Sequence, residues 1–186
     1  MSIDRIISSL PRARIGDTYN QYSRSQLRRE RLAAYLDGHR NAKLLLVGEA
    51  AGYRGARISG IPFTSERQLT GLGPAEATAT IVHRVLAELG LEEDVLLWNL
   101  VPTHPHRPGD PYSNRRPTRE EIEDGRPFLE ILSPGRRILP VGRLAQAALG
   151  GPYIRHPSHG GAVAFRQTLA GLLPCALGGR LSAAFT

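Results

Sequence analysis

Short apolar runs alternate with amphipathic stretches along most of this chain, a pattern typical of strands that alternate with helices. The apolar runs are bounded by loops and indicate three buried strands, at residues 43–47, 95–100 and 137–141. A shorter segment at residues 153–155 is expected to add a fourth strand. The stretches with helical spacing predict helices over residues 18–36, 74–89, 118–132, 143–149 and 161–172.

Two of the predicted helices carry recognisable start signals. Pro74 stands in the first turn of one helix, where its missing N–H is tolerated, and Gly90 follows the end of that helix. Thr118 and Glu121 have the spacing of a capping box at the start of another helix. These signals support the assignment of the two segments as helices.

The alternation predicts an α/β fold, with a central, mainly parallel four-stranded sheet flanked by helices. A chain of 186 residues fits one domain. We therefore expect a single domain over residues 1–186. It comprises a helical N-terminal segment at about residues 1–40 and a core at about residues 41–172 that bears the motifs.

The composition is that of an ordinary globular protein, with 41% hydrophobic and 22% charged residues. No apolar run approaches the ~18 residues that cross a bilayer. The first residues lack the apolar region of a signal peptide. We therefore expect a cytoplasmic monomer that makes no membrane contact.

Charge and cysteine content narrow the classes of partner and cofactor. The formal net charge of +7 favours a polyanionic partner such as nucleic acid, although a merely solvated basic surface gives the same number. Cys175 is the only cysteine, which excludes an internal disulfide and any all-cysteine metal site within one chain. His104 and His106 lack an evident third ligand, so we expect neither a bound metal nor another cofactor.

Polar residues follow the predicted strands at the points where the strands end. The segment GEAAG at 48–52 follows the first strand, and Asn99 with the proline-rich loop 101–117 closes the second. The segment HPS at 156–158 follows the expected fourth strand. Ligand sites of open α/β sheets lie at the carboxyl ends of strands, so these segments are expected to meet in one crevice.

Four motifs in this order resemble those of the uracil-DNA glycosylase superfamily: GEAAG at 48–52, GIPF at 60–63, WNLVPTHPHRP at 98–108 and HPSHGG at 156–161. The resemblance covers about residues 40–172, and the iron–sulfur-containing bacterial and archaeal branch is the most similar. It implies a repair enzyme that flips uracil out of single- or double-stranded DNA. The enzyme would then hydrolyse the N-glycosidic bond and leave an abasic site.

The resemblance also implies roles for individual residues. Phe63 would stack on the flipped base, and the Asn99 amide would pair with O4 and N3–H of uracil. His156 would donate to O2 as negative charge develops on the leaving base. Glu49 would orient the attacking water and stabilise the sugar cation. Glu49 and His156 are thus the expected catalytic residues.

Three further positions of the strand-end loop are expected to line the base pocket: Gly48, Ala50 and Gly52. Ala50 stands where the best-known branch of the superfamily has an aspartate, which leaves Glu49 as the only carboxylate of the motif. Gly52 stands where that branch has a tyrosine that excludes the methyl group of thymine. We therefore expect a more open pocket that tolerates other deaminated or modified bases.

Five residues outside the base pocket are predicted to contact DNA: Arg107, Arg115, Arg116, Ser158 and His159. In the superfamily, a wedge that is often leucine fills the hole left by the flipped base, but here Gly160 stands at that place. Either His159 or a side chain from another loop would take this role. A poorly filled hole would instead favour single-stranded DNA.

The resemblance does not carry the iron–sulfur cluster, because Thr103 and Gly125 correspond to two of its cysteine positions. Alternatives to uracil excision remain open. One is a glycosylase for hypoxanthine or xanthine, and another is a protein that traps uracil DNA covalently through His104 or His106. A nucleotide-binding module is disfavoured, because neither GxGxxG nor GxxxxGK[ST] follows the first strand.

Overall fold

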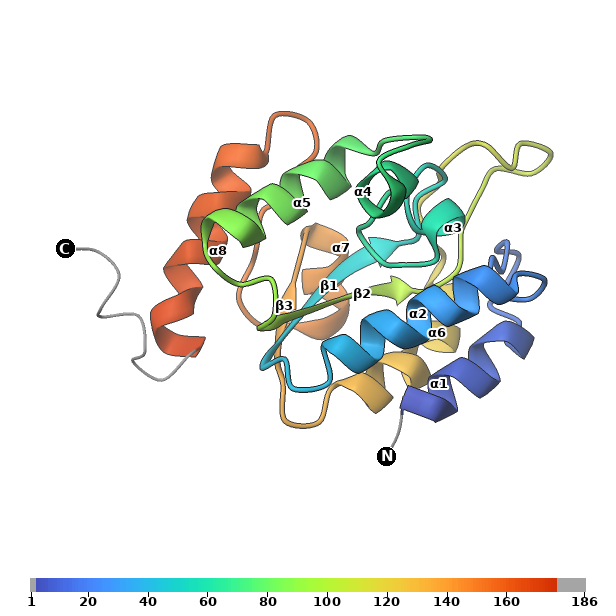
Figure 1. The fold of residues 1–186 in the computed structure, drawn as a ribbon, viewed down its shortest axis with the longest axis horizontal. Coiled ribbons are helices and arrows are strands. Elements are labelled where there is room, and N and C mark those ends of the chain that lie inside the picture. Colours follow the sequence, from blue (N-terminus) through green and yellow to red (C-terminus); the bar gives the residue numbers. More distant parts are fainter. Residues whose placement is uncertain (1–2, 177–186) are drawn as a thin grey trace.

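A parallel sheet with strand order β2–β1–β3 lies at the centre of the molecule (Figure 1). Its strands are β1 (Leu44–Ala50), β2 (Val95–Val101) and β3 (Arg137–Pro140). The computed structural model describes residues 3–176. Residues 1–2 and 177–186 lie outside the described residues, and with them most of the C-terminal stretch to which the sequence assigns no role.

Side chains of β1 alternate between two apolar cores, one on each face of the sheet. Leu45 and Val47 belong to one core, and Leu44 and Leu46 belong to the other. Figure 1 shows α5 and α8 on one side of the sheet and α1, α2 and α6 on the other. The helices are α1 (Ile3–Ser9), α2 (Gln26–Gly38), α3 (Ala56–Ser59), α4 (Glu66–Thr70), α5 (Ala77–Glu88), α6 (Arg119–Leu132), α7 (Arg143–Leu149) and α8 (Ala162–Ala176), with a 3-10 turn η1 (Leu10–Arg12) after α1. The expected α/β architecture is confirmed.

The predicted fourth strand is not formed, and the sheet within residues 3–176 has three strands. Ile154 makes a single parallel bridge to Val141: its carbonyl accepts from Gly142 N at 2.8 Å, and its N–H donates to Pro140 O at 3.2 Å. Pro152, two residues before Ile154, has no N–H to donate to the next position of the ladder. On the other side, the chain after Val141 enters α7 at Arg143, so the pairing stops at one bridge.

Helix α2 begins at Gln26 instead of near residue 18, because a side chain ties the preceding segment into turns. The Asn20 amide nitrogen donates to Leu10 O at 2.8 Å and to Ala13 O at 3.0 Å, and its oxygen accepts from Tyr22 N at 3.0 Å. These local bonds compete with helix formation. Ser25 then caps α2 by accepting from Arg28 N.

The other helix starts agree more closely with the sequence. The capping box of α6 is confirmed: Thr118 accepts from Glu121 N at 3.2 Å, and the Glu121 carboxylate accepts from Thr118 N at 2.8 Å. Helix α5 begins at Ala77, after Pro74, because the Pro74 carbonyl is engaged with Arg67 N of α4.

The N-terminal segment packs on the sheet through apolar residues, as expected. Ile6, Leu10, Leu32 and Leu36 are fully buried in the same core as Trp98 of β2. A paired contact adds to this packing, since Arg31 makes two hydrogen bonds to the Glu66 carboxylate, at 2.8 and 2.9 Å. Among the described residues, no helix is both long and apolar enough to cross a membrane.

Candidate active site

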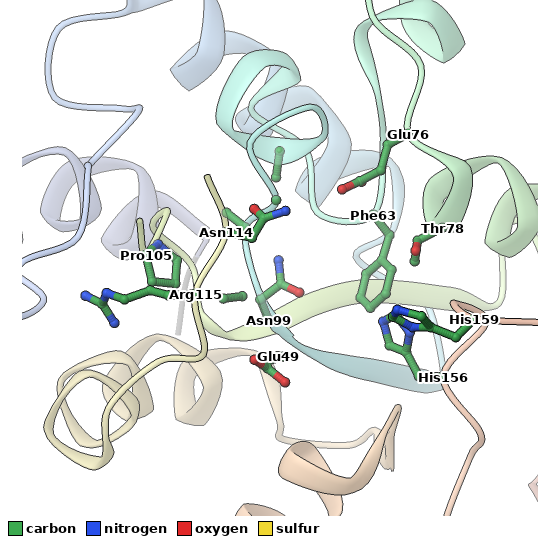
Figure 2. A pocket seen from close by; sticks show the side chains of 14 residues that line it. Glu49, Phe63, Glu76, Thr78, Asn99, Pro105, Asn114, Arg115, His156 and His159 are labelled. Atoms are coloured by element: carbon green, nitrogen blue, oxygen red, sulfur yellow. The ribbon is translucent and has the colours of Figure 1, made fainter. Parts of the chain in front are cut away.

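A cavity of about 350 Å³ opens at the carboxyl ends of β1 and β2 (Figure 2). The first two strands, the α5 start, the 101–117 loop and the HPS loop all contribute to its wall. Its lining consists of Glu49, Ala50, Ala51, Gly52, Ala56, Phe63, Glu76, Thr78, Asn99, Pro105, Asn114, Arg115, His156 and His159. The structure thus brings together Glu49, Phe63, Asn99 and His156, which are far apart in the sequence.

Strand register sets the relation between the GEAAG loop and Asn99. Gly48 of β1 is the direct partner of Asn99 in β2, so Glu49 follows at the same edge of the sheet. Asn99 is only 4% exposed. Within residues 3–176, its side-chain amide has no hydrogen-bond partner. A buried amide that faces a cavity without a partner is available to a ligand edge.

Phe63 is held against the backbone of Gly48. A Cβ atom at Gly48 would lie 2.2 Å from Cζ of Phe63 and 3.0 Å from Oδ1 of Asn99, so only glycine fits. Phe63 itself has φ of +53°, an uncommon and costly conformation for a residue with a side chain. The strained backbone conformation at Phe63 therefore places its ring in the cavity wall.

The hydrogen bonds of His156 define which ring nitrogen carries the proton. Nδ1 accepts from the backbone N–H of Ser158 at 3.2 Å, and the Ser158 hydroxyl lies 2.8 Å from the same atom. A backbone amide can only donate, so Nδ1 is the acceptor and Nε2 carries the hydrogen in the neutral ring. Burial lowers the pKa of His156, and Arg155 and His159 lower it further. The side chain is therefore a neutral donor through Nε2.

Glu49 lies half-buried at the end of β1, in the lower part of the view in Figure 2. Burial raises the pKa of its carboxyl above the ordinary value of 4.5, and the charge of Arg116 opposes part of that rise. A carboxylate with a raised pKa is a stronger base toward water. The arrangement thus places a base, a flat ring, an unpaired amide and a neutral donor around one cavity.

The family model of the uracil DNA glycosylase superfamily matches residues 36–177 of this chain. The chain belongs to the uracil DNA glycosylase superfamily. Its fold is similar to the crystal structure of wild-type SMUG2 from Pedobacter heparinus, with a TM-score of 0.67 and 12% sequence identity. That match covers 92% of this chain and 96% of the other. A search of curated protein sequences finds no match.

Family membership and fold together support a DNA glycosylase, with DNA as its partner. The superfamily resemblance drawn from the four motifs is therefore confirmed. The roles assigned to individual residues go beyond these comparisons. They rest on the four motifs and on the geometry of the cavity.

The three arginines that are predicted to contact DNA differ in their surroundings. Arg115 makes two hydrogen bonds to the buried carboxylate of Glu121, at 2.8 and 2.5 Å, and also donates to His106 O. Arg107 and Arg116 are exposed, and neither forms an ion pair within the described residues. Arg107 and Arg116 are thus the free cations of this loop, whereas Arg115 holds the loop on α6.

The HPS loop presents His159 at the mouth of the cavity. His159 is exposed and has φ of +52°, followed by Gly160 with φ of +72°. Ser158 lies behind it, and the Ser158 hydroxyl contacts both His156 and His159. Gly161 permits this turn, since a Cβ there would lie 2.2 Å from His156 O. Ser158 therefore positions the two histidines, in addition to any contact with DNA.

The two positions that correspond to cluster cysteines do not fit an iron–sulfur group. Thr103 is fully buried and shares a hydrogen bond of 2.5 Å with Thr18. A Cβ at Gly125 would lie 2.2 Å from Leu100 O, so α6 packs directly on β2 there. Neither position offers a sulfur ligand. Among the described residues, no group of three or more His, Cys, Asp or Glu side chains could hold a metal ion.

Sequence reasoning missed several residues of the cavity wall: Pro105, Asn114, Glu76 and Thr78. Pro105 and Asn114 belong to the loop that the motifs already marked. Glu76 and Thr78 follow a stretch with no motif, and no sequence signal identifies them. Only the packing of the α5 start against the GEAAG loop brings them to the cavity.

Proposed function

We propose that this protein is a uracil-DNA glycosylase that hydrolyses the N-glycosidic bond of a flipped uracil. The observation that carries the proposal is the meeting of Glu49, Phe63, Asn99 and His156 around one cavity. An extrahelical base needs a stacking surface, a reader for its edge, and stabilisation of charge on the leaving group. Each requirement has one candidate side chain in the cavity wall.

The reaction follows from these positions. Uracil stacks on Phe63, and the Asn99 amide pairs with O4 and N3–H. The bond between the sugar C1′ and N1 breaks with its electron pair on the base, and Nε2–H of His156 donates to O2 as that charge develops. Water held by Glu49 bonds to C1′ and gives a proton to the carboxylate. The uracil anion then takes up a proton from solvent while Glu49 returns its proton to solvent, and the products are free uracil and an abasic site.

The base readers favour uracil over cytosine. Uracil offers an acceptor at O4 and a donor at N3, whereas cytosine offers a donor and an acceptor at the corresponding atoms. Asn99 is buried between Gly48 and the cavity, so the orientation that suits one base cannot suit the other at the same time. A buried polar group left unpaired costs about 1–3 kcal/mol, which sets the scale of this selectivity.

The covalent-trapping alternative receives no support from the geometry. His104 is fully buried, and its Nδ1 donates to Ala51 O at 2.8 Å, which fixes the GEAAG loop from behind. Neither His104 nor His106 is among the residues of the cavity wall. The cavity that holds Glu49 is therefore lined by neither of the two histidines that the alternative requires.

The test uses single-stranded and duplex oligonucleotides with one uracil, followed by alkali, which cleaves DNA at an abasic site. Cleavage by the wild-type protein and strong impairment of Glu49→Ala and His156→Ala support the proposal. A parallel panel with hypoxanthine and xanthine tests the alternative substrates. A protein–DNA adduct on a denaturing gel would instead indicate trapping. Absence of cleavage on every uracil substrate would refute the proposed activity.

The monomeric state and the cytoplasmic location stay predictions from the sequence. Size-exclusion chromatography coupled to light scattering tests the first, and cell fractionation tests the second. The proposed reaction uses only side chains of this chain and water.

A further inference from the structure

The carboxylate of Glu76 lies over the strand-end loop at Gly52 and Gly55. A Cβ atom at Gly52 would lie 2.2 Å from Oε1 of Glu76, and a Cβ at Gly55 would lie 2.1 Å from Oε2. Glu76 is the residue immediately before α5 and belongs to the cavity wall. Figure 2 shows its side chain extending toward the cavity that Phe63 and Asn99 also line.

The Glu76 carboxylate forms no pair that would stabilise the fold within the described residues. Within the described residues, the Glu76 side chain has no hydrogen-bond or ion-pair partner, and it does not cap α5. Burial raises its pKa above 4.5 without an opposing cation. A polar group that is desolvated without a partner is unfavourable for stability, and such groups gather at functional sites.

The location of Glu76 bears on the expectation of a more open pocket at Gly52. The superfamily resemblance assigns to Gly52 the place of a tyrosine that excludes the methyl group of thymine. Here the space that a side chain at Gly52 would enter is filled by Glu76, which comes from a different part of the chain. A carboxylate therefore lines the pocket at this edge, where the loop itself has only glycine.

We propose that Glu76 is a specificity-determining residue that excludes bases with a methyl group at C5. The proposal rests on the function proposed above, because it takes the base to be a pyrimidine read by Asn99. A methyl group directed at Gly52 would collide with the Glu76 carboxylate, which fills that space, and it offers the carboxylate no hydrogen bond. Uracil has only a hydrogen atom at C5 and therefore needs less room at this position.

The experiment compares excision of uracil and of thymine, each opposite guanine in the same duplex. Glu76→Ala removes the wall, and the ratio of uracil to thymine rates falls by about tenfold or more, the effect of one methyl-sized difference in a pocket. Glu76→Gln keeps the size of the side chain but not the charge, so its ratio lies between those of the wild type and Glu76→Ala. Glu93→Ala is the matched control: it is the same substitution at an exposed glutamate outside the cavity, and its ratio stays that of the wild type.

A binding measurement separates failure of this proposal from failure of the proposed function. Oligonucleotides with 2′-fluorinated uridine or thymidine resist glycosidic cleavage, and their dissociation constants are measured by fluorescence anisotropy. If the wild-type protein cleaves no uracil DNA, the glycosylase proposal fails, but the ratio of the two dissociation constants still tests Glu76. A ratio that shifts toward thymine in Glu76→Ala supports the wall. A ratio equal to that of the wild type, in a variant with unchanged thermal unfolding, overturns it.

Discussion

The backbone N–H of Ser158 donates to Nδ1 of His156 at 3.2 Å, and this contact fixes the tautomer of the imidazole. Since Nδ1 is an acceptor here, the only N–H of the neutral ring is at Nε2. The contact is made by the backbone, so it survives replacement of the Ser158 side chain. Replacing the Ser158 side chain therefore tests its hydroxyl group without removing the contact that fixes the His156 tautomer.

We expect His156→Ala to lower the rate of uracil excision by about 10²–10³, the effect of removing one donor to a developing anion. Ser158→Ala keeps the backbone donor, so it lowers the rate by about tenfold or less. Single-turnover kinetics at saturating enzyme give both rates without a contribution from product release. Equal losses in the two variants would contradict the assignment of the tautomer to the backbone contact.

The pH dependence of the excision rate should reflect the protonation of the Glu49 carboxyl. Burial raises the pKa of Glu49 above 4.5, and the active form is the carboxylate, so the rate falls as the pH drops through that raised pKa. Glu49→Gln should lower the rate at neutral pH by about 10²–10⁴. The same variant should lose the acidic limb of the profile. The measurement is the single-turnover rate between acidic and neutral pH, and an unchanged acidic limb in Glu49→Gln would assign it to another group.

Gly48→Ala should impair excision through displacement of the stacking ring. The added Cβ would lie 2.2 Å from Phe63 and 3.0 Å from Asn99, so both side chains must move. A misplacement of about 1 Å can cost about 10²-fold in rate. Gly38→Ala is the matched control, because a Cβ there has no atom within 4 Å. Wild-type activity of Gly48→Ala would show that the contact between Phe63 and the backbone is not needed.

Among the arginines of the 101–117 loop, we expect one to contribute to stability and two to contribute to DNA binding. Arg115→Ala leaves the Glu121 carboxylate buried without its ion-pair partner, which destabilises the fold by about 3 kcal/mol. Arg107→Ala and Arg116→Ala leave the free energy of unfolding nearly unchanged and weaken DNA binding, with a smaller dependence on salt. Urea unfolding and salt titrations of DNA affinity measure the two effects. A stable Arg115→Ala variant would show that Arg115 does not hold the loop.

The ion pair between Arg115 and Glu121 should also make the stability of the fold depend on pH. Burial by itself raises the pKa of Glu121, but hydrogen bonds from Arg115 and from the Thr118 backbone outweigh it and lower the pKa overall. A lowered pKa in the folded state means that the stabilisation is present above the unfolded pKa and is lost as the pH falls through the folded one. The free energy of unfolding of the Arg115→Ala variant should therefore fall less on acidification than that of the wild-type protein.

His159 is the candidate for filling the stack after the base leaves it. His159 is exposed and lines the cavity, and the superfamily resemblance places the wedge in this loop. His159→Ala should lower the excision rate from duplex DNA more than from single-stranded DNA, because only the duplex has a partner stack to support. The two rates are compared under identical conditions. An equal decrease on both substrates would assign His159 to the base pocket instead.

Several features of this protein follow from its sequence alone. The apolar runs indicate the three strands, because a buried parallel strand requires continuous apolar side chains. The spacing of Thr118 and Glu121 indicates the α6 start, because a capping box is a local arrangement. Glu49, Asn99 and His156 stand in short motifs. The first two lie near the ends of strands, and His156 follows the single bridge at Ile154. These features depend on residues that are near each other in the chain.

Other features were decided by tertiary contacts. The segment around Ile154 has strand-like residues, but the chain after its partner Val141 enters α7, so the pairing stops at one bridge. The start of α2 at Gln26 depends on bonds from Asn20 to the carbonyls of Leu10 and Ala13, which helical periodicity does not reveal. Glu76 reaches the cavity only because α5 packs against the GEAAG loop, and no local pattern encodes that approach. The sequence determined most of the candidate groups for the chemistry, and the tertiary structure decided which groups share one cavity, because that depends on packing between segments far apart in the chain.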